Sequence, residues 1–91
     1  MTLEDALFNW LQIRIAADRR PDDRAAQETA DFFLSVLRDT HGVTNVRVEP
    51  KGDDLIQVVY ERAGQSGRKT FDRRFAEQLW QDIEGNPAFN E

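Results

Sequence analysis

The sequence predicts a single α+β domain of order α-α-β-β-β-α, with a three-stranded antiparallel meander packed against helices. Apolar residues recur with a helical period up to about residue 40. They then alternate with a period of two, and return to a helical period after residue 71. The chain has 91 residues, enough for one hydrophobic core and too few for two. Hydrophobic residues make up 40% of the chain and charged residues 32%, a balance typical of a globular domain.

The first helix is expected over residues 3–18, with Thr2 as its N-cap. Glu4 and Asp5 lie in its first turn, where the helix dipole favours carboxylates. Apolar side chains occupy a very broad arc of this helix, so one neighbouring element cannot cover all of them. These side chains are Leu3, Ala6, Leu7, Phe8, Trp10, Leu11, Ile13 and Ile15.

A second helix is expected over residues 22–40, because Pro21 suits the start of a helix. Gly42 supplies the left-handed residue that ends it. Alternating patterns then predict strands over 43–49, 55–62 and 68–71. The middle strand has apolar residues on both faces, which is typical of a central strand, whereas Lys69 suits an exposed edge strand.

The third helix is expected over residues 73–84, capped by Asp72 and ended by Gly85, and residues 86–91 are expected to fray. Most aromatic side chains are expected to lie in the core with Leu79. The expected core set is Phe32, Phe33, Tyr60, Phe71, Phe75 and Leu79.

The apolar first helix is the strongest indication of an interaction surface. A three-stranded sheet has room for two helices on one face. The first helix must therefore stack on the second, cover the other face or an edge of the sheet, or pack against another molecule. We expect it to dock a protein partner or a second copy of the chain, with Trp10 as the anchor. The expected interface residues are Phe8, Trp10, Leu11 and Ile15.

Charge is unevenly distributed along the chain. Residues 62–74 hold five bases and one acid, a formal charge of +4, whereas the remainder holds seven bases and sixteen acids, a charge of −9. This segment is a candidate contact for an anion or an acidic partner, and nucleic-acid binding is the alternative function that it suggests. Its bases are Arg62, Arg68, Lys69, Arg73 and Arg74.

The order helix, three strands, helix over residues 21–85 resembles that of a double-stranded-RNA-binding domain. Gly67-Arg68-Lys69 and Arg73-Arg74 are similar to the basic cluster that this family places at the start of its last helix. The resemblance implies contacts with RNA phosphates from these bases. The chain departs from the family in the acidic residues of the same helix, which are Glu77, Asp82 and Glu84.

The composition excludes several chemistries. The chain has no cysteine and one histidine, His41, so thiolate catalysis, disulfides and Cys- or His-rich metal sites are excluded. No serine lies in a nucleophile motif, and the adjacent acids of Asp22-Asp23 and Asp53-Asp54 suit turns and helix starts better than a metal.

We therefore expect a non-catalytic interaction domain with no cofactor. The N-terminus has acids where a signal peptide has bases, and no apolar stretch approaches the roughly 20 residues that span a bilayer. A cytoplasmic location without membrane contact is expected.

Overall fold

The computed structural model describes residues 1–85, and the predicted fraying of residues 86–91 lies outside the described residues. The predicted order α-α-β-β-β-α is confirmed. The elements are α1 (Leu3–Arg19), α2 (Arg24–His41), β1 (Val43–Lys51), β2 (Leu55–Arg62), β3 (Gln65–Asp72) and α3 (Arg73–Gly85).

The predicted helix ends are confirmed at three caps. Thr2 Oγ1 accepts a hydrogen bond from the Asp5 amide at 3.1 Å, and Asp72 Oδ1 accepts one from the Arg74 amide at 2.8 Å. Gly42 ends α2 in the left-handed region, with a φ of 71°. The start of α2 differs from the prediction by two residues, because Asp23 is its N-cap and accepts from the Ala26 amide.

The strands extend further than predicted. β1 continues through Pro50 and Lys51, which pair with Ile56 and Leu55. A proline fits here because β1 is an edge strand. β3 begins at Gln65, since Ala63 and Gly64 both have positive φ and turn the chain in two residues.

β2 is the central strand of a sheet with the order β1-β2-β3, as predicted. In this register Val48, Val58 and Lys69 lie side by side on the face that carries the core. The opposite face carries a row with Val59 between two arginines of the edge strands, Arg47 and Arg68.

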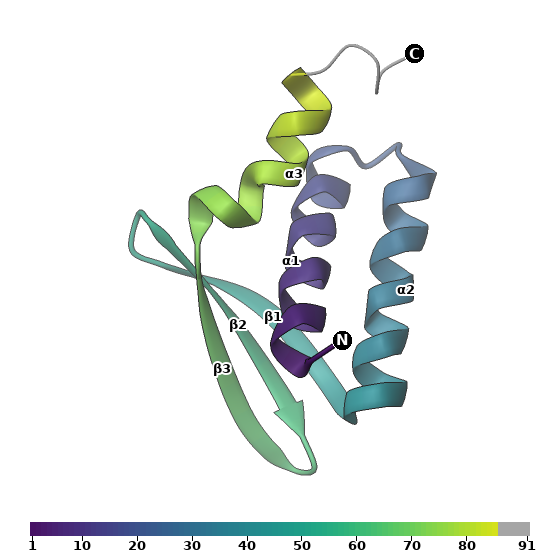
Figure 1. Ribbon diagram of the computed structural model, residues 1–91, viewed down its shortest axis with the longest axis vertical. Helices are drawn as coiled ribbons and strands as arrows, with labels where there is room; N and C mark the ends of the chain where they lie inside the picture. Colours follow the sequence, from purple (N-terminus) through teal and green to yellow (C-terminus); the bar gives the residue numbers. More distant parts are fainter. Residues whose placement is uncertain (86–91) are drawn as a thin grey trace.

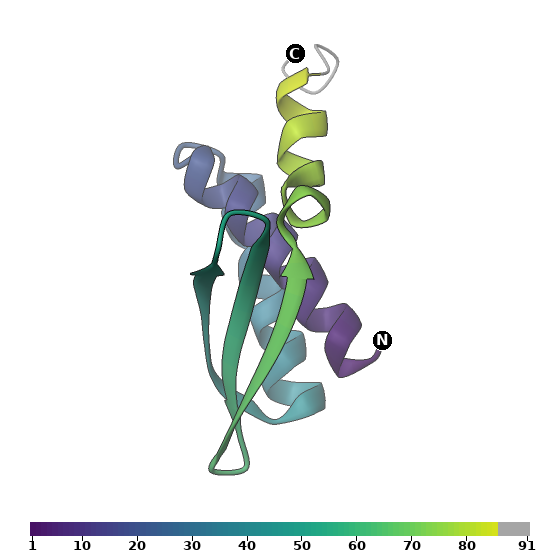
Figure 2. The ribbon, with the colours of Figure 1, turned by 90° about the vertical axis from the view of Figure 1, so that its left-hand side faces the viewer.

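α1 lies between the sheet and α2, and α3 packs along one end of α1 (Figure 1). Seen from the sheet side, the strands form the front layer, α1 and α2 lie behind them, and α3 extends beyond the end of the sheet (Figure 2). The broad apolar arc of α1 is therefore covered from several sides within the chain. Among residues 1–85, no helix is long and apolar enough to cross a membrane.

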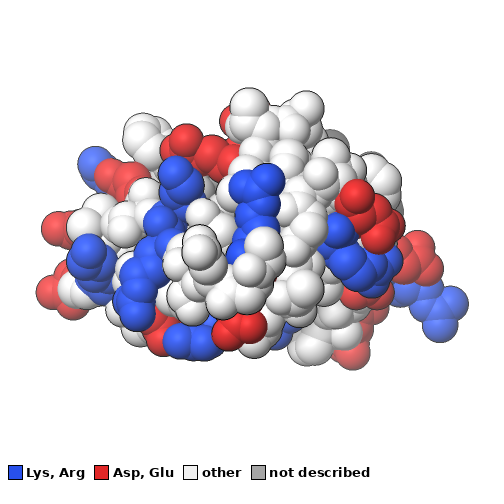
Figure 3. Space-filling model, turned by 90° about the horizontal axis from the view of Figure 1, so that it is seen from below, with Lys and Arg blue, Asp and Glu red and all other residues white. Residues whose placement is uncertain are grey.

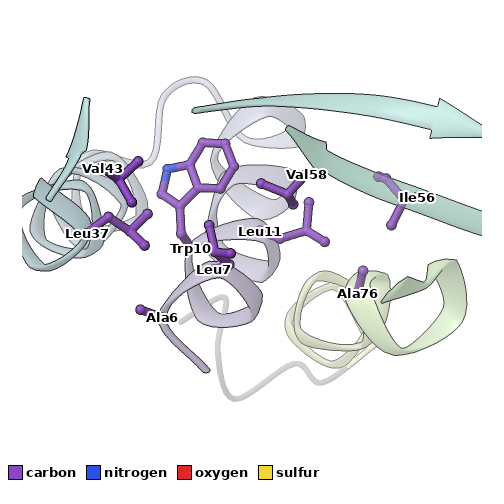
Figure 4. Packing of buried hydrophobic residues seen from close by; sticks show 9 residues of the cluster. All are labelled: Ala6, Leu7, Trp10, Leu11, Leu37, Val43, Ile56, Val58 and Ala76. Carbon is purple, nitrogen blue, oxygen red and sulfur yellow. The ribbon is translucent and has the colours of Figure 1, made fainter. Parts of the chain in front are cut away.

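The main core joins α1 to the sheet and to both other helices, as Figure 4 shows. Its buried residues are Ala6, Leu7, Trp10, Leu11, Leu37, Val43, Ile56, Val58 and Ala76. A second cluster joins α1 to α2 through alanines and Ile13, with Leu79, Trp80 and Ile83 of α3 packed against it.

The prediction that Phe32 and Phe75 lie in the core is wrong. Phe32 is 59% exposed and Phe75 is 66% exposed. α2 packs mainly on α1 and buries a single stripe that includes Ala30 and Leu37, and Phe32 lies outside that stripe. Phe75 likewise lies outside the side of α3 that turns Ala76 into the core.

Candidate functional site

The predicted interface on α1 is divided between the core and its margin. Trp10 is 2% exposed and Leu11 is 0% exposed, so neither can meet a partner while the domain is folded. These two predicted interface residues therefore belong to the core of the single chain. Phe8 and Ile15 are half-buried against the core, and the Phe8 ring lies 5.3 Å from that of Phe71.

The bases of residues 62–74 do not share one surface. Arg68 and Lys69 lie on opposite faces of the sheet because neighbouring strand residues alternate. Arg62 lies beside the β2–β3 turn, whereas Arg73 and Arg74 lie beyond the other end of β3. From the end that carries this turn, basic side chains stand in separate groups with acidic and uncharged ones between them (Figure 3). The geometry therefore does not favour the nucleic-acid alternative.

The two arginines at the start of α3 have acidic neighbours. Arg73 Nη1 lies 3.9 Å from the Glu77 carboxylate, and Arg74 Nε lies 4.0 Å from that of Asp72. Glu77 also forms an ion pair with Arg19. The guanidinium carbon of Arg19 lies over the Trp80 ring, 4.7 Å from the ring centroid. The contacts of Arg19 tie α3 to α1, and the carboxylates of Asp72 and Glu77 balance much of the positive charge at this end of the segment.

A groove lies between the C-terminal half of α2 and the start of β1, and we call it the β1 groove. It encloses about 270 Å³. Its lining is mainly apolar, with one charged side chain at the rim. The lining residues are Leu34, Leu37, Arg38, Val43, Thr44, Asn45 and Val46. Its volume is below the roughly 300–1,000 Å³ typical of small-molecule sites, so it suits a side chain better than a whole ligand.

The groove opens beside an unpaired strand edge. β1 pairs with β2 on one side, and among the described residues no strand pairs with its other side (Figure 2). A strand edge of this kind presents backbone N–H and C=O groups that another extended segment can bind. Lining residues 43–46 belong to β1, so an added strand and an inserted side chain would meet the same site.

The Trp10 side chain contributes an unused hydrogen-bond donor near this groove. Its Nε1 atom is buried and has no hydrogen-bond partner within the described structure. Figure 4 shows the nitrogen on the side of the ring that faces Leu37 and Val43, both of which line the groove.

The single charge of the β1 groove is the guanidinium of Arg38. Its Nε donates a hydrogen bond of 3.0 Å to Asp39 Oδ1. This hydrogen bond and the negative charge of Asp39 raise the pKa of Arg38 above its ordinary value. Arg38 is therefore a permanent cation at the rim.

The acidic residues and the histidine of the described structure were candidates for a metal site. Within residues 1–85, no group of three or more His, Asp or Glu residues is placed to hold a metal ion. His41 is half-buried at the end of α2 and its Nε2 has no hydrogen-bond partner. No serine lies beside it as a nucleophile in any hydrogen bond of the described structure.

Sequence reasoning missed the β1 groove because its lining comes from two elements that look complete by themselves. Leu34 and Leu37 belong to the apolar arc of α2, and Val43 and Val46 to the alternating pattern of β1. The available signal was the surplus of apolar residues over what a narrow sheet and three helices need. The sequence points to α1 as the site of that surplus because the apolar arc of α1 is the broadest.

Comparisons of the chain with models of protein families, with curated proteins and with solved structures give no match.

Proposed function

We propose that this protein is a non-catalytic interaction domain that binds an extended segment of a protein partner along β1. The observation that carries the proposal is an apolar groove directly beside an unpaired strand edge. The segment would extend the sheet as a fourth strand. We keep the prediction of a protein partner, and we place the surface that binds it on β1 instead of α1.

Strand addition uses both parts of the site. Backbone hydrogen bonds to the edge give affinity for any extended chain, and pockets for alternate side chains give selectivity. The core-facing residues of β1 include Val46, which is half-buried and packs against the core. An inward side chain of the added strand would lie next to Val46 and fill the apolar space between β1 and Leu34.

The proposed function is tested with a panel of synthetic hexapeptides that alternate threonine with valine, leucine or phenylalanine. Binding is followed by amide chemical shifts of the ¹⁵N-labelled protein. We expect shifts in β1 and in the C-terminal half of α2. A panel that shifts no amide, or shifts only residues outside these elements, overturns the proposal.

A charge placed in the groove provides the matched variant. Val46→Lys should abolish the shifts because the ammonium group enters the apolar space. Thr70→Lys adds the same group on β3, at the other edge of the sheet, and should leave binding unchanged. Equal binding by both variants contradicts the β1 groove as the site.

A second copy of the chain is the competing occupant. If β1 amides shift when the protein alone is concentrated, and the mass by light scattering doubles, then the edge pairs with itself. That outcome replaces the partner segment by a copy of this chain and overturns the proposal in its present form.

A further inference from the structure

The turn between β2 and β3 fixes which way the backbone groups of the sheet point. Residues 63–64 both have positive φ, and a two-residue turn of this type closes on a hydrogen-bonded pair, here Arg62 with Gln65. Backbone groups point alternately to the two sides of a strand, so Arg62 faces β3 and Glu61 faces β1. The Glu61 carbonyl accordingly accepts a 3.4 Å hydrogen bond from Thr44 Oγ1 of β1.

The same alternation decides which residues of β1 face away from the sheet. Val46 pairs with Tyr60, and Val48 pairs with Val58. Tyr60 and Val58 lie two and four residues before Arg62, so they also face β3 and exchange no hydrogen bonds with β1. The N–H and C=O groups of Val46 and Val48 therefore point to the edge of β1 that no strand of residues 1–85 covers (Figure 2). No turn, loop or cap hydrogen bond within those residues involves either valine.

Two irregularities limit how much of this edge another chain can use. Thr44 is an extra residue of β1, at which the pairing register with β2 shifts. Pro50 lies two residues beyond Val48, so its nitrogen also faces the open edge, where it offers no donor. Between these positions, Val46 and Val48 each offer a donor and an acceptor. A short segment fits such an edge better than the nine-residue β1 of a second copy does.

We infer, resting on the proposed function, that β1 recognises a three-residue motif with apolar first and third residues, whose backbone pairs with Val46 and Val48. Residues opposite these two valines place their side chains on the same face as the valines. Both valines are half-buried against the core, and Val46 lines the β1 groove. The middle residue of the motif lies beside Arg47 on the other face, which is open to solvent there, so its identity is free.

Proline substitutions test the backbone assignment in the protein alone. Val48→Pro removes an N–H group that faces solvent, whereas Glu49→Pro removes one that bonds to β2. We expect Glu49→Pro to lower the guanidinium midpoint of unfolding well below that of Val48→Pro. In hydrogen exchange of the wild-type protein, the amides of Val46 and Val48 should exchange about tenfold or more faster than that of Arg47. Equal protection, or the reverse order, overturns the inference and leaves the proposed function standing.

Two acetylated, amidated pentapeptides of the same composition test the motif on the whole protein. Thr-Val-Thr-Val-Thr places both valines on one face of an extended chain. In Thr-Thr-Val-Val-Thr, one of the adjacent valines must face away from the groove. We expect the alternating peptide to bind about three- to tenfold more tightly, because it buries one more apolar side chain. Equal affinity of the two peptides contradicts the motif.

Val48→Pro and Val48→Ala form the matched pair of variants for the edge. Both lose the valine side chain, but only the proline variant also loses the N–H group. We expect Val48→Pro to bind the alternating peptide about three- to tenfold more weakly than Val48→Ala does, through the loss of one hydrogen bond. Equal affinity of the two variants refutes the pairing with Val48. Failure of both peptides to bind the wild-type protein overturns the proposed function and the inference together.

Discussion

Replacing Trp10 with alanine separates a core role from an interface role most sharply. The side chain is 2% exposed and lies among Leu37, Val43 and Val58 in the main core (Figure 4). Within residues 1–85 its Nε1 has no hydrogen-bond partner, so the expected loss is worked out from packing. We expect the substitution to lower the free energy of unfolding strongly, whatever the protein concentration.

The magnitude follows from the area that the ring removes from water. A buried aromatic side chain covers roughly 150–250 Å², which at about 25 cal/mol per Å² corresponds to roughly 4–6 kcal/mol. Alanine still buries its own methyl group, and measured Trp→Ala substitutions in cores cost about 3–5 kcal/mol. A domain of this length unfolds with roughly 5–14 kcal/mol, so the substitution removes a large part of its stability.

Guanidinium unfolding followed by far-ultraviolet circular dichroism measures this loss. Phe75→Ala is the matched control, because that ring is 66% exposed and its removal should change the free energy of unfolding by less than about 1 kcal/mol. Trp10→Phe keeps a ring in the cavity and should lie between Trp10→Ala and the wild type. If Trp10→Ala unfolds at the wild-type midpoint but lowers the mass of an oligomer in solution, then Trp10 is an interface residue and the burial argument is wrong.

Three further substitutions test local features of the fold by the same unfolding measurement. A Cβ at Gly67 would overlap the Tyr60 ring, so Gly67→Ala should lower the free energy of unfolding by about 1 kcal/mol. In a Tyr60→Ala background the same substitution should not lower it. Equal losses in the two backgrounds would refute the contact. Ala63→Asn should stabilise the β2–β3 turn by about 0.5–1 kcal/mol because asparagine tolerates the φ of 53° better than alanine, and a loss of stability would contradict this turn geometry. Asp23→Ala should lower the free energy of unfolding by about 1 kcal/mol because it removes the cap of α2, whereas Asp23→Asn should keep most of the capping stabilisation. Equal losses for the two variants would assign the effect to the ion pair with Arg20.

The elements of the fold could be predicted because each one is specified by residues close together in the chain. Thr2, Gly42 and Asp72 act on the backbone within a few residues of themselves, and the structure confirms all three. The end of β1, which differed, depends on pairing with another strand. Pro50 belongs to β1 through its partner Ile56, and no pattern within residues 50–54 shows that pairing.

The order of the layers could not be predicted from the same patterns. The apolar arc of residues 3–18 indicates that α1 must be covered on several sides, but it does not say by what. The sequence predicts an interface at Trp10 because three helices exceed the room on one face of a narrow sheet. In the structure α2 stacks on α1, which was one of the arrangements the sequence left open, and this places Trp10 in the core.

The same arrangement explains why the β1 groove exists. α1 and α3 occupy the core face of the sheet, so α2 meets the sheet chiefly where it joins β1. The apolar side chains of Leu34 and Val46 therefore remain half-buried on either side of a gap that no described element fills. The apolar residues of α1 are buried in the core, whereas those at this junction keep exposed apolar surface. By holding α2 away from the sheet, α1 thus leaves the groove at the α2–β1 junction that we propose as the docking surface.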